Sequence, residues 1–285
     1  MGCLSSKEVI KHQDTLDSDW KFLIVLDACR YDYFEKCFSP FLKGNLEKRK
    51  SPAIHTPEWL EKTFVDYYED IIYISPVFWC NSVKKICENP FYGKEHFFKV
   101  INCWRGGWDE EFGTVPPWYI NKVAKRCAMS YPNKRLVIHY FQPHAPYLSI
   151  KPRVKVQKRN LDKFKEGKKV TIKRKVIRKG SAVVHRTFGT EVLWRLIRSL
   201  GLEPYTNMEE AWRIAGIVGL QKAYEKNLET ALYFVRELVP SLRFGKIVVT
   251  ADHGELLGEK RFWGHGPPKP RIPKLTTVPW LEIEE

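Results

Sequence analysis

The sequence lacks several features that would place it in a simple class. No run of about eighteen consecutive apolar residues occurs in its 285 residues, so we expect no transmembrane segment. Residues 1–20 contain no apolar core of a secretory signal, and the expected location is therefore cytoplasmic. The seven cysteines form no Cys-x-x-Cys pair, which predicts reduced thiols and excludes zinc-ribbon and thioredoxin-like motifs.

Acidic residues are outnumbered, and the imbalance is concentrated in one place. The whole chain carries +15, of which +12 belongs to residues 151–179, with fourteen lysines and arginines. This segment contains a single aromatic residue, Phe164, so it does not match a single-strand nucleic-acid platform, and no specific nucleic acid is predicted. We interpret it as a basic insertion (about 151–180) in a single domain covering 1–285, which attracts an anionic substrate, glycan or lipid.

Short apolar runs alternate with helical patterns along the chain. The runs that predict strands cover residues 21–27, 70–75, 97–104, 134–141, 244–250 and 276–283. The patterns that predict helices cover residues 57–66, 117–130, 190–200 and 208–238. This alternation predicts an α/β fold with a mostly parallel central sheet and helices on both faces.

Polar side chains stand where three of the predicted strands end. Asp27 ends the first strand, His139 and His144 lie at or beyond the fourth, and Asp252 and His253 follow the fifth. The carboxyl ends of parallel strands lie along one edge of a sheet, which is where α/β proteins build their sites. Aspartate and histidine are also a common metal-ligand combination, so these residues predict a site at that edge.

Thr56 stands at the predicted start of a helix. The order Thr56, Pro57 and Glu58 predicts Thr56 as the N-cap and Pro57 as the first helical residue. The Thr56 hydroxyl would then lie beside backbone N–H groups that suit an anion.

Five segments, in this order, resemble the alkaline phosphatase/sulfatase superfamily, and more closely its sulfatase-like hydrolases. They read "LIVLDACRYDYF", "SPAIHTPEWL", "HYFQPHAPY", "AYEKNLE", and "TADHGELLGE" followed by "WGHG" and "VPWL". Together they extend over about residues 21–282, nearly the whole chain. The resemblance implies an alkaline phosphatase-like fold.

The resemblance also implies a divalent metal held by Asp27, Thr56, Asp252 and His253. Thr56 would be the nucleophile that attacks a phosphoryl or sulfuryl centre, because a bound cation lowers the pKa of a hydroxyl and neutralises ester oxygens. Ser51 is the alternative nucleophile. The ligand types suit manganese, zinc, magnesium or calcium, and one or two ions.

Other residues receive roles around this centre. His144 and His265 would contact substrate, protonate the leaving group or complete a second metal site, with His144 facing the substrate. Arg30 would either bind substrate or pair with Asp32 and hold the first loop. Three residues are expected to support the site without binding the metal: His139, Asn227 and Glu255.

The sequence departs from the sulfatase pattern at two positions. No cysteine lies in a Cys-x-Pro-x-Arg segment, and Thr56 occupies the corresponding position. The first strand ends in Asp27-Ala28, where those sulfatases have two adjacent aspartates. The predicted activity is therefore metal-dependent hydrolysis of a phosphate (or sulfate) ester. The alternatives are a transferase that passes a phospho-head group to a glycan or lipid hydroxyl, and a non-catalytic protein that docks on an anionic partner.

Overall fold

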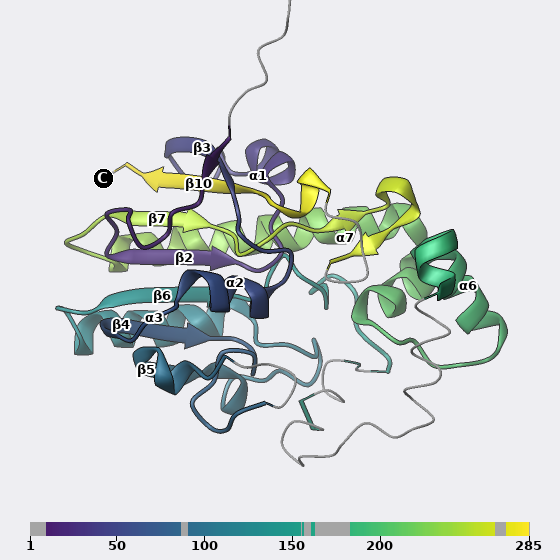
Figure 1. The fold of residues 1–285 in the computed structure, drawn as a ribbon, viewed down its shortest axis with the longest axis horizontal. Helices are drawn as coiled ribbons and strands as arrows, with labels where there is room; N and C mark the ends of the chain where they lie inside the picture. Colours follow the sequence, from purple (N-terminus) through teal and green to yellow (C-terminus); the bar gives the residue numbers. More distant parts are fainter. Residues whose placement is uncertain are drawn as a thin grey trace, which may run out of the picture.

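The structure is a computed structural model that describes residues 10–86, 91–154, 156, 161–162, 183–265 and 272–284. Most of the predicted basic insertion, residues 151–180, lies outside the described residues. The remaining helices and strands can be followed from end to end in Figure 1.

A central sheet of eight strands organises the molecule (Figure 1). Its order is β1 (Lys11–His12), β3 (Gly44–Lys50), β10 (Thr277–Ile283), β7 (Ile247–Thr250), β2 (Phe22–Leu26), β6 (Arg135–Tyr140), β4 (Tyr68–Ser75) and β5 (Phe97–Asn102). The run from β7 to β5 is parallel, whereas β10 is antiparallel to both β7 and β3. The predicted mostly parallel α/β sheet is thereby confirmed.

Helices cover both faces of this sheet. They are α1 (Tyr31–Cys37), α2 (Thr56–Thr63), α3 (Pro117–Ser130), α6 (Thr190–Ser199) and α7 (Asn207–Leu238). Short 3-10 turns occur at Gly93–Glu95, Cys103–Arg105, Val239–Ser241, Glu259–Arg261 and Pro273–Leu275, and a small hairpin pairs β8 (Leu256–Leu257) with β9 (Trp263–Gly264). Figure 1 shows α2 on the near side of the sheet and α3 and α7 on the far side.

Strand β2 shows how the sequence produces two cores. Successive side chains of a strand point to opposite faces. Ile24 and Leu26 lie in the core shared with α3 and α7, and Leu23 and Val25 lie in the core shared with Trp59 of α2. All five residues of β2 are buried, which explains why this strand reads as one continuous apolar run.

Strand β3 and helix α1 are among the elements that were not predicted from the sequence. Strand β3 reads "GNLEKRK" and is only half-buried, so it has no apolar run to mark it. Its place is fixed by antiparallel pairing with β10, more than 200 residues later in the chain. Helix α1 follows Arg30 without a side-chain cap, so its start carries no sequence signal.

Helix α7 is interrupted at Gly216, where φ is +69°. Glycine adopts this left-handed conformation without the strain that a Cβ would add. Of the described helices, α7 included, none has a stretch long and apolar enough to cross a lipid bilayer.

Candidate active site

Asp27 and Asp252 meet at one edge of the sheet because they follow neighbouring parallel strands. Asp27 comes directly after β2, and Asp252 comes two residues after β7. In the register of these strands Val25 pairs with Thr250, so both chains leave the sheet at the same level. Both aspartates are buried, with exposed fractions of 3% and 0%.

His253 completes the first cluster. Its Nε2 lies 3.6 Å from Oδ1 of Asp27 and 3.3 Å from Oδ2 of Asp252. Its Nδ1 lies 2.8 Å from the carbonyl oxygen of Gly254. A carbonyl only accepts, so Nδ1 carries a proton, and Nε2 is the ring nitrogen that faces the two carboxylates.

These three residues fit a divalent cation. Oδ1 of Asp27 and Nε2 of His253 are buried and have no hydrogen-bond partner. Buried polar atoms without partners are costly, and buried carboxylates are normally paired or coordinated to metal. Two carboxylates and an imidazole lone pair directed at one point are a ligand set that satisfies all of these atoms at once.

The two carboxyl groups have opposite pKa shifts. Burial, followed by the negative charges of Asp252 and Glu255, raises the pKa of Asp27 well above its ordinary value. Burial also acts to raise the pKa of Asp252, but His253 and a hydrogen bond from Thr56 outweigh it, and the pKa is lowered. Without a cation, therefore, a proton binds more readily at Asp27 than at Asp252.

Thr56 contributes its hydroxyl to this cluster. The hydroxyl is buried and donates a hydrogen bond to Oδ2 of Asp252 at 2.8 Å. The prediction of Thr56 as N-cap is wrong: His55 is the N-cap, and its Nδ1 accepts a hydrogen bond from Glu58 N at 3.2 Å. The helix starts at Thr56 with Pro57 second, and because His55 does the capping, the Thr56 hydroxyl is available to the site.

Ser51, the alternative nucleophile, is arranged differently. Its hydroxyl donates to the backbone carbonyl of Asp252 at 2.5 Å and accepts a hydrogen bond from Ala53 N at 3.2 Å. Both partners are backbone groups, so the Ser51 hydroxyl is engaged in fixing the loop after β3 and not with the side chains of the cluster.

A second cluster adjoins the first. His144, Glu255 and His265 place one ligand atom each within 4.8 Å of one another. Nδ1 of His265 lies 3.0 Å from Oε1 of Glu255, and the His265 ring lies 4.3 Å from the ring of His253, centroid to centroid. Burial, followed by the nearby His265, lowers the pKa of His144 to about 4, so this imidazole is neutral at pH 7. The second cluster can bind a cation or a substrate oxygen.

Asn227 of α7 holds the loop that carries His144. Its Nδ2 donates to the carbonyl oxygens of Pro143 and His144, both at 3.1 Å, and its Oδ1 accepts from Leu148 N at 2.9 Å. The expected supporting role of Asn227 is exercised through these bonds.

His139 lies behind Asp27. Its Nδ1 is hydrogen-bonded to the Tyr73 hydroxyl at 2.7 Å, and its Nε2 lies 3.9 Å from Oδ2 of Asp27. This placement agrees with the expectation that His139 supports the site from within the core.

Arg30 is committed to side chains of the protein. It donates to Asp32 at 2.9 and 2.7 Å and to Glu259 at 2.6 Å, and Lys274 also reaches Asp32 at 2.6 Å. These bonds tie α1 to the segment between β8 and β9, as expected if Arg30 holds the first loop. A direct substrate contact by Arg30 stays a prediction.

Two supporting residues were missed by the sequence reasoning. The Tyr224 hydroxyl donates to the Ala28 carbonyl at 2.8 Å and accepts from Arg30 N at 3.0 Å. It therefore fixes the turn after Asp27, in which Ala28 has a left-handed φ of +60°. Gln13 links Thr250 and Trp59 through its amide. Tyr224 lies within the quoted "AYEKNLE" segment, whereas nothing in the sequence distinguishes Gln13.

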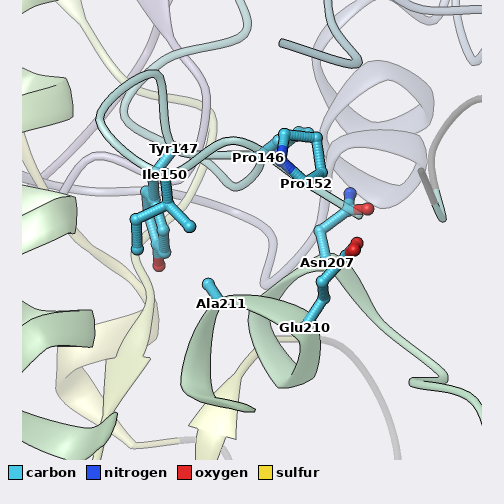
Figure 2. A pocket seen from close by; sticks show the side chains of 7 residues that line it. All are labelled: Pro146, Tyr147, Ile150, Pro152, Asn207, Glu210 and Ala211. Atoms are coloured by element: carbon cyan, nitrogen blue, oxygen red, sulfur yellow. The ribbon is translucent and has the colours of Figure 1, made fainter. Parts of the chain in front are cut away.

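A pocket opens beyond His144, off the two clusters (Figure 2). It is lined by Pro146, Tyr147, Ile150, Pro152, Asn207, Glu210 and Ala211. Figure 2 shows the two proline rings above the first turn of α7, from which Asn207, Glu210 and Ala211 project. One carboxylate oxygen of Glu210 accepts from Val154 N, while the other is buried without a partner. The pocket is thus apolar with one acidic group.

No protein-family model and no curated protein matches this sequence. Solved structures do match its fold. The integral membrane protein lipooligosaccharide phosphoethanolamine transferase A from Neisseria meningitidis is 14% identical, with a TM-score of 0.53 over 98% of this chain and 51% of the transferase. The chain thus spans about half the length of that enzyme.

Two further structures give the same result. The soluble domain of that transferase is 13% identical, with a TM-score of 0.52 over 96% of this chain and 80% of the domain. A 2-O GAG sulfatase is 8% identical, with a TM-score of 0.50 over 94% of this chain and 65% of the sulfatase. These likenesses confirm the fold that the resemblance implied.

Proposed function

Because the chain has the fold of the alkaline phosphatase/sulfatase superfamily, we propose that it is a metal-dependent enzyme that cleaves phosphate (or sulfate) esters through Thr56. The observation that carries this proposal is the hydroxyl of Thr56, hydrogen-bonded to Asp252 beside two unsatisfied ligand atoms of Asp27 and His253. A divalent cation held by Asp27, Thr56, Asp252 and His253 would lower the pKa of the hydroxyl and neutralise the ester oxygens.

Thr56 performs the first step. Its Oγ1 forms a bond to phosphorus (or sulfur) while the bond from that atom to the leaving oxygen breaks. The hydroxyl proton departs along the existing hydrogen bond to Asp252. Pro57 has no N–H, and the N–H groups of Glu58 and Trp59 bond His55, so the start of α2 would act on the charge of the transferring group through the helix dipole.

The second cluster performs the proton transfers at the leaving group. The His265 ring lies 5.0 Å from the His144 ring and 4.3 Å from the His253 ring, centroid to centroid, and His265 is partly exposed. A proton from the His265 imidazole passes to the leaving oxygen, and the same group later accepts one from the attacking water, while His144, neutral at pH 7, contacts the substrate. Glu255 orients His265 through the bond to Nδ1.

The transferase alternative keeps the same first step. The Thr56 adduct would pass to a glycan or lipid hydroxyl instead of water, and fold-level likeness to phosphoethanolamine transferases supports this alternative. The non-catalytic alternative predicts that the first cluster binds no metal.

The test uses metal-stripped protein and paired aryl phosphate and aryl sulfate esters. Manganese, zinc, magnesium and calcium are added singly, and Thr56→Ala is compared with the wild type. The expected result is metal-dependent cleavage that Thr56→Ala abolishes. Ser51→Ala is the matched control, because Ser51 is an equally buried hydroxyl that contacts only backbone. Loss of activity in Ser51→Ala and not in Thr56→Ala would assign the nucleophile to Ser51.

Mass spectrometry of the quenched reaction separates the alternatives. A phosphorylated peptide containing Thr56 that decays in water alone supports the hydrolase. Decay only after addition of a glycan or glycerol hydroxyl supports the transferase. If calorimetry detects no binding of any of the four metals, the non-catalytic alternative holds.

A further inference from the structure

Exposed apolar side chains are concentrated in one stretch of the chain. Of the seventeen large apolar side chains exposed among the described residues, nine lie between residues 183 and 218. We call these nine the outer apolar surface: Val183, Phe188, Val192, Leu196, Leu200, Leu202, Tyr205, Ile214 and Val218. In Figure 1, α6 stands at the margin of the molecule away from the central sheet.

Helix α6 has an apolar face that is wider than the part it buries. Trp194 points inward, and its ring lies 6.1 Å from the ring of Trp263 in β9. Val192, Leu196 and Leu200 follow at intervals of four residues and continue the apolar face into solvent. One flank of this helix is therefore partly open to solvent.

The start of α7 adds a second exposed apolar stretch. Residues 214–219 read Ile-Ala-Gly-Ile-Val-Gly, the helix is broken there at Gly216, and Val218 is 65% exposed. Arg213 donates to the Leu202 carbonyl at 2.8 Å, so this break lies next to the connection between α6 and α7. Many exposed apolar side chains in neighbouring elements are typical of an interaction site.

The charges around the outer apolar surface identify the occupant. Arg186, Arg195 and Arg198 are exposed, whereas Glu203 is the one exposed acidic residue in the described range 183–218. The remaining acidic groups there are buried or bonded to neighbours. The sequence immediately before this range, residues 151–179, carries +12. Apolar side chains flanked by arginine are typical of helices that lie in the interface of anionic membranes.

We propose that the outer apolar surface docks on an anionic lipid bilayer, with its apolar side chains in the interfacial region and the arginines at the phosphate groups. The inner side of α6 holds β9: Thr190 accepts from Trp263 N at 2.9 Å, and Trp263 Nε1 donates to Glu191 at 3.0 Å. His265 is two residues beyond Trp263. One helix, about 10 Å in diameter, therefore separates the bilayer from the strand that leads to the second cluster.

The test is binding of the full chain to sedimentable vesicles, at low and high salt. Vesicles of equal parts phosphatidylcholine and phosphatidylglycerol are compared with pure phosphatidylcholine. Wild-type protein is expected to bind the anionic vesicles more tightly, and to keep part of this binding at high salt, where electrostatic attraction is screened. The variant Leu196→Ser/Leu200→Ser/Tyr205→Ser/Val218→Ser should lose about tenfold or more in partitioning, and all of the salt-resistant part.

A matched control removes equally exposed apolar side chains elsewhere. It carries Val65→Ser, Tyr67→Ser, Met129→Ser and Phe244→Ser, whose parent side chains are 57–94% exposed, and it should bind like the wild type. Equal binding by both variants, or no vesicle binding by the wild type, would overturn the proposal. A wild-type dimer that becomes monomeric in the Leu196 variant would also overturn it, because a second copy would then cover the surface. Binding is read without turnover, so the result is independent of the ester chemistry.

Discussion

The two clusters of the site differ in how deeply their side chains are buried and in the structural elements on which their residues lie. Asp27, Asp252 and His253 are all buried and follow directly from strands β2 and β7. His144 and His265 are only partly buried, and they lie on loops that join distant elements. The first cluster is part of the sheet edge, whereas the second is assembled by hydrogen bonds between loops.

This difference indicates a division of labour. A ligand set at strand ends is held by the ladder of the sheet, so its geometry is fixed and suits an ion and a nucleophile that require constant distances. Side chains that lie on loops and are partly exposed can contact a substrate and exchange protons with water. The predictions below test whether the two clusters are separable in this way.

The largest expected effect comes from neutralising one buried carboxylate in each cluster and comparing the two losses. Asp252→Asn and Glu255→Gln each neutralise a fully buried carboxylate without changing its size. We expect Asp252→Asn to lower kcat/KM by about 10³-fold or more and to abolish metal binding, because it removes a ligand and the partner of Thr56. Glu255→Gln should cost about 10–100-fold, as loss of a group that orients a histidine does. Steady-state kinetics and metal calorimetry measure both. Equal losses would mean that the two clusters act as one unit.

The next effect tests proton donation by the second cluster. His265→Asn should lower kcat by about 10²-fold on esters with alkyl leaving groups. His144 is not expected to be the donor, because its pKa is lowered to about 4 and its imidazole is neutral at pH 7. On nitrophenyl esters the loss in His265→Asn should be much smaller, since nitrophenolate leaves without a proton. Uniform losses on both kinds of ester would instead assign His265 to metal or substrate binding.

Much of the fold could be predicted because the strands that form its centre are buried on both faces. Strands β2, β6 and β7 read as apolar runs, and their order along the chain already placed Asp27 and Asp252 at a common edge. Strand β3 escaped prediction because its stability comes from pairing with β10 and not from an apolar face.

The site could be predicted in its residue types but not in its bonds. Capping by His55 was missed because histidine is not a typical N-cap residue, and the hydrogen bond from Thr56 to Asp252 spans 196 positions. Tyr224 acts on Ala28 across the same separation. Contacts between loops so far apart depend on the tertiary packing, and local patterns do not encode them.

The folding stability of the metal-free protein tests the buried carboxylates of the first cluster. Because the pKa of Asp27 is raised on folding, its protonation stabilises the metal-free protein at low pH, and this contribution is lost as the pH rises through the raised pKa. Asp27→Asn should therefore raise the free energy of unfolding of the metal-free protein by about 1 kcal/mol at neutral pH, with a gain that shrinks toward pH 4. Denaturant unfolding at several pH values checks this.

Two comparisons control the Asp27 experiment. Asp70→Asn should not stabilise the protein, because Arg135 bonds this exposed carboxylate and lowers its pKa. With metal added, the wild type should become more stable than Asp27→Asn, because the ion stabilises only the wild type. An Asp27→Asn protein that is less stable than the wild type without metal would contradict the buried like-charge arrangement.

The smallest effect concerns the turn that carries Asp27. Tyr224→Phe removes the hydroxyl that bonds both Ala28 and Arg30, so we expect a loss of metal affinity of up to about tenfold. Tyr140→Phe is its matched control: Tyr140 is equally buried, and its hydroxyl donates to Asn121 of α3, away from the clusters. Both variants should lose about 1 kcal/mol of stability, but only Tyr224→Phe should change metal affinity. If calorimetry shows the wild-type metal affinity for both variants, the sheet edge alone fixes Asp27, and α7 does not contribute to the rigidity of the first cluster.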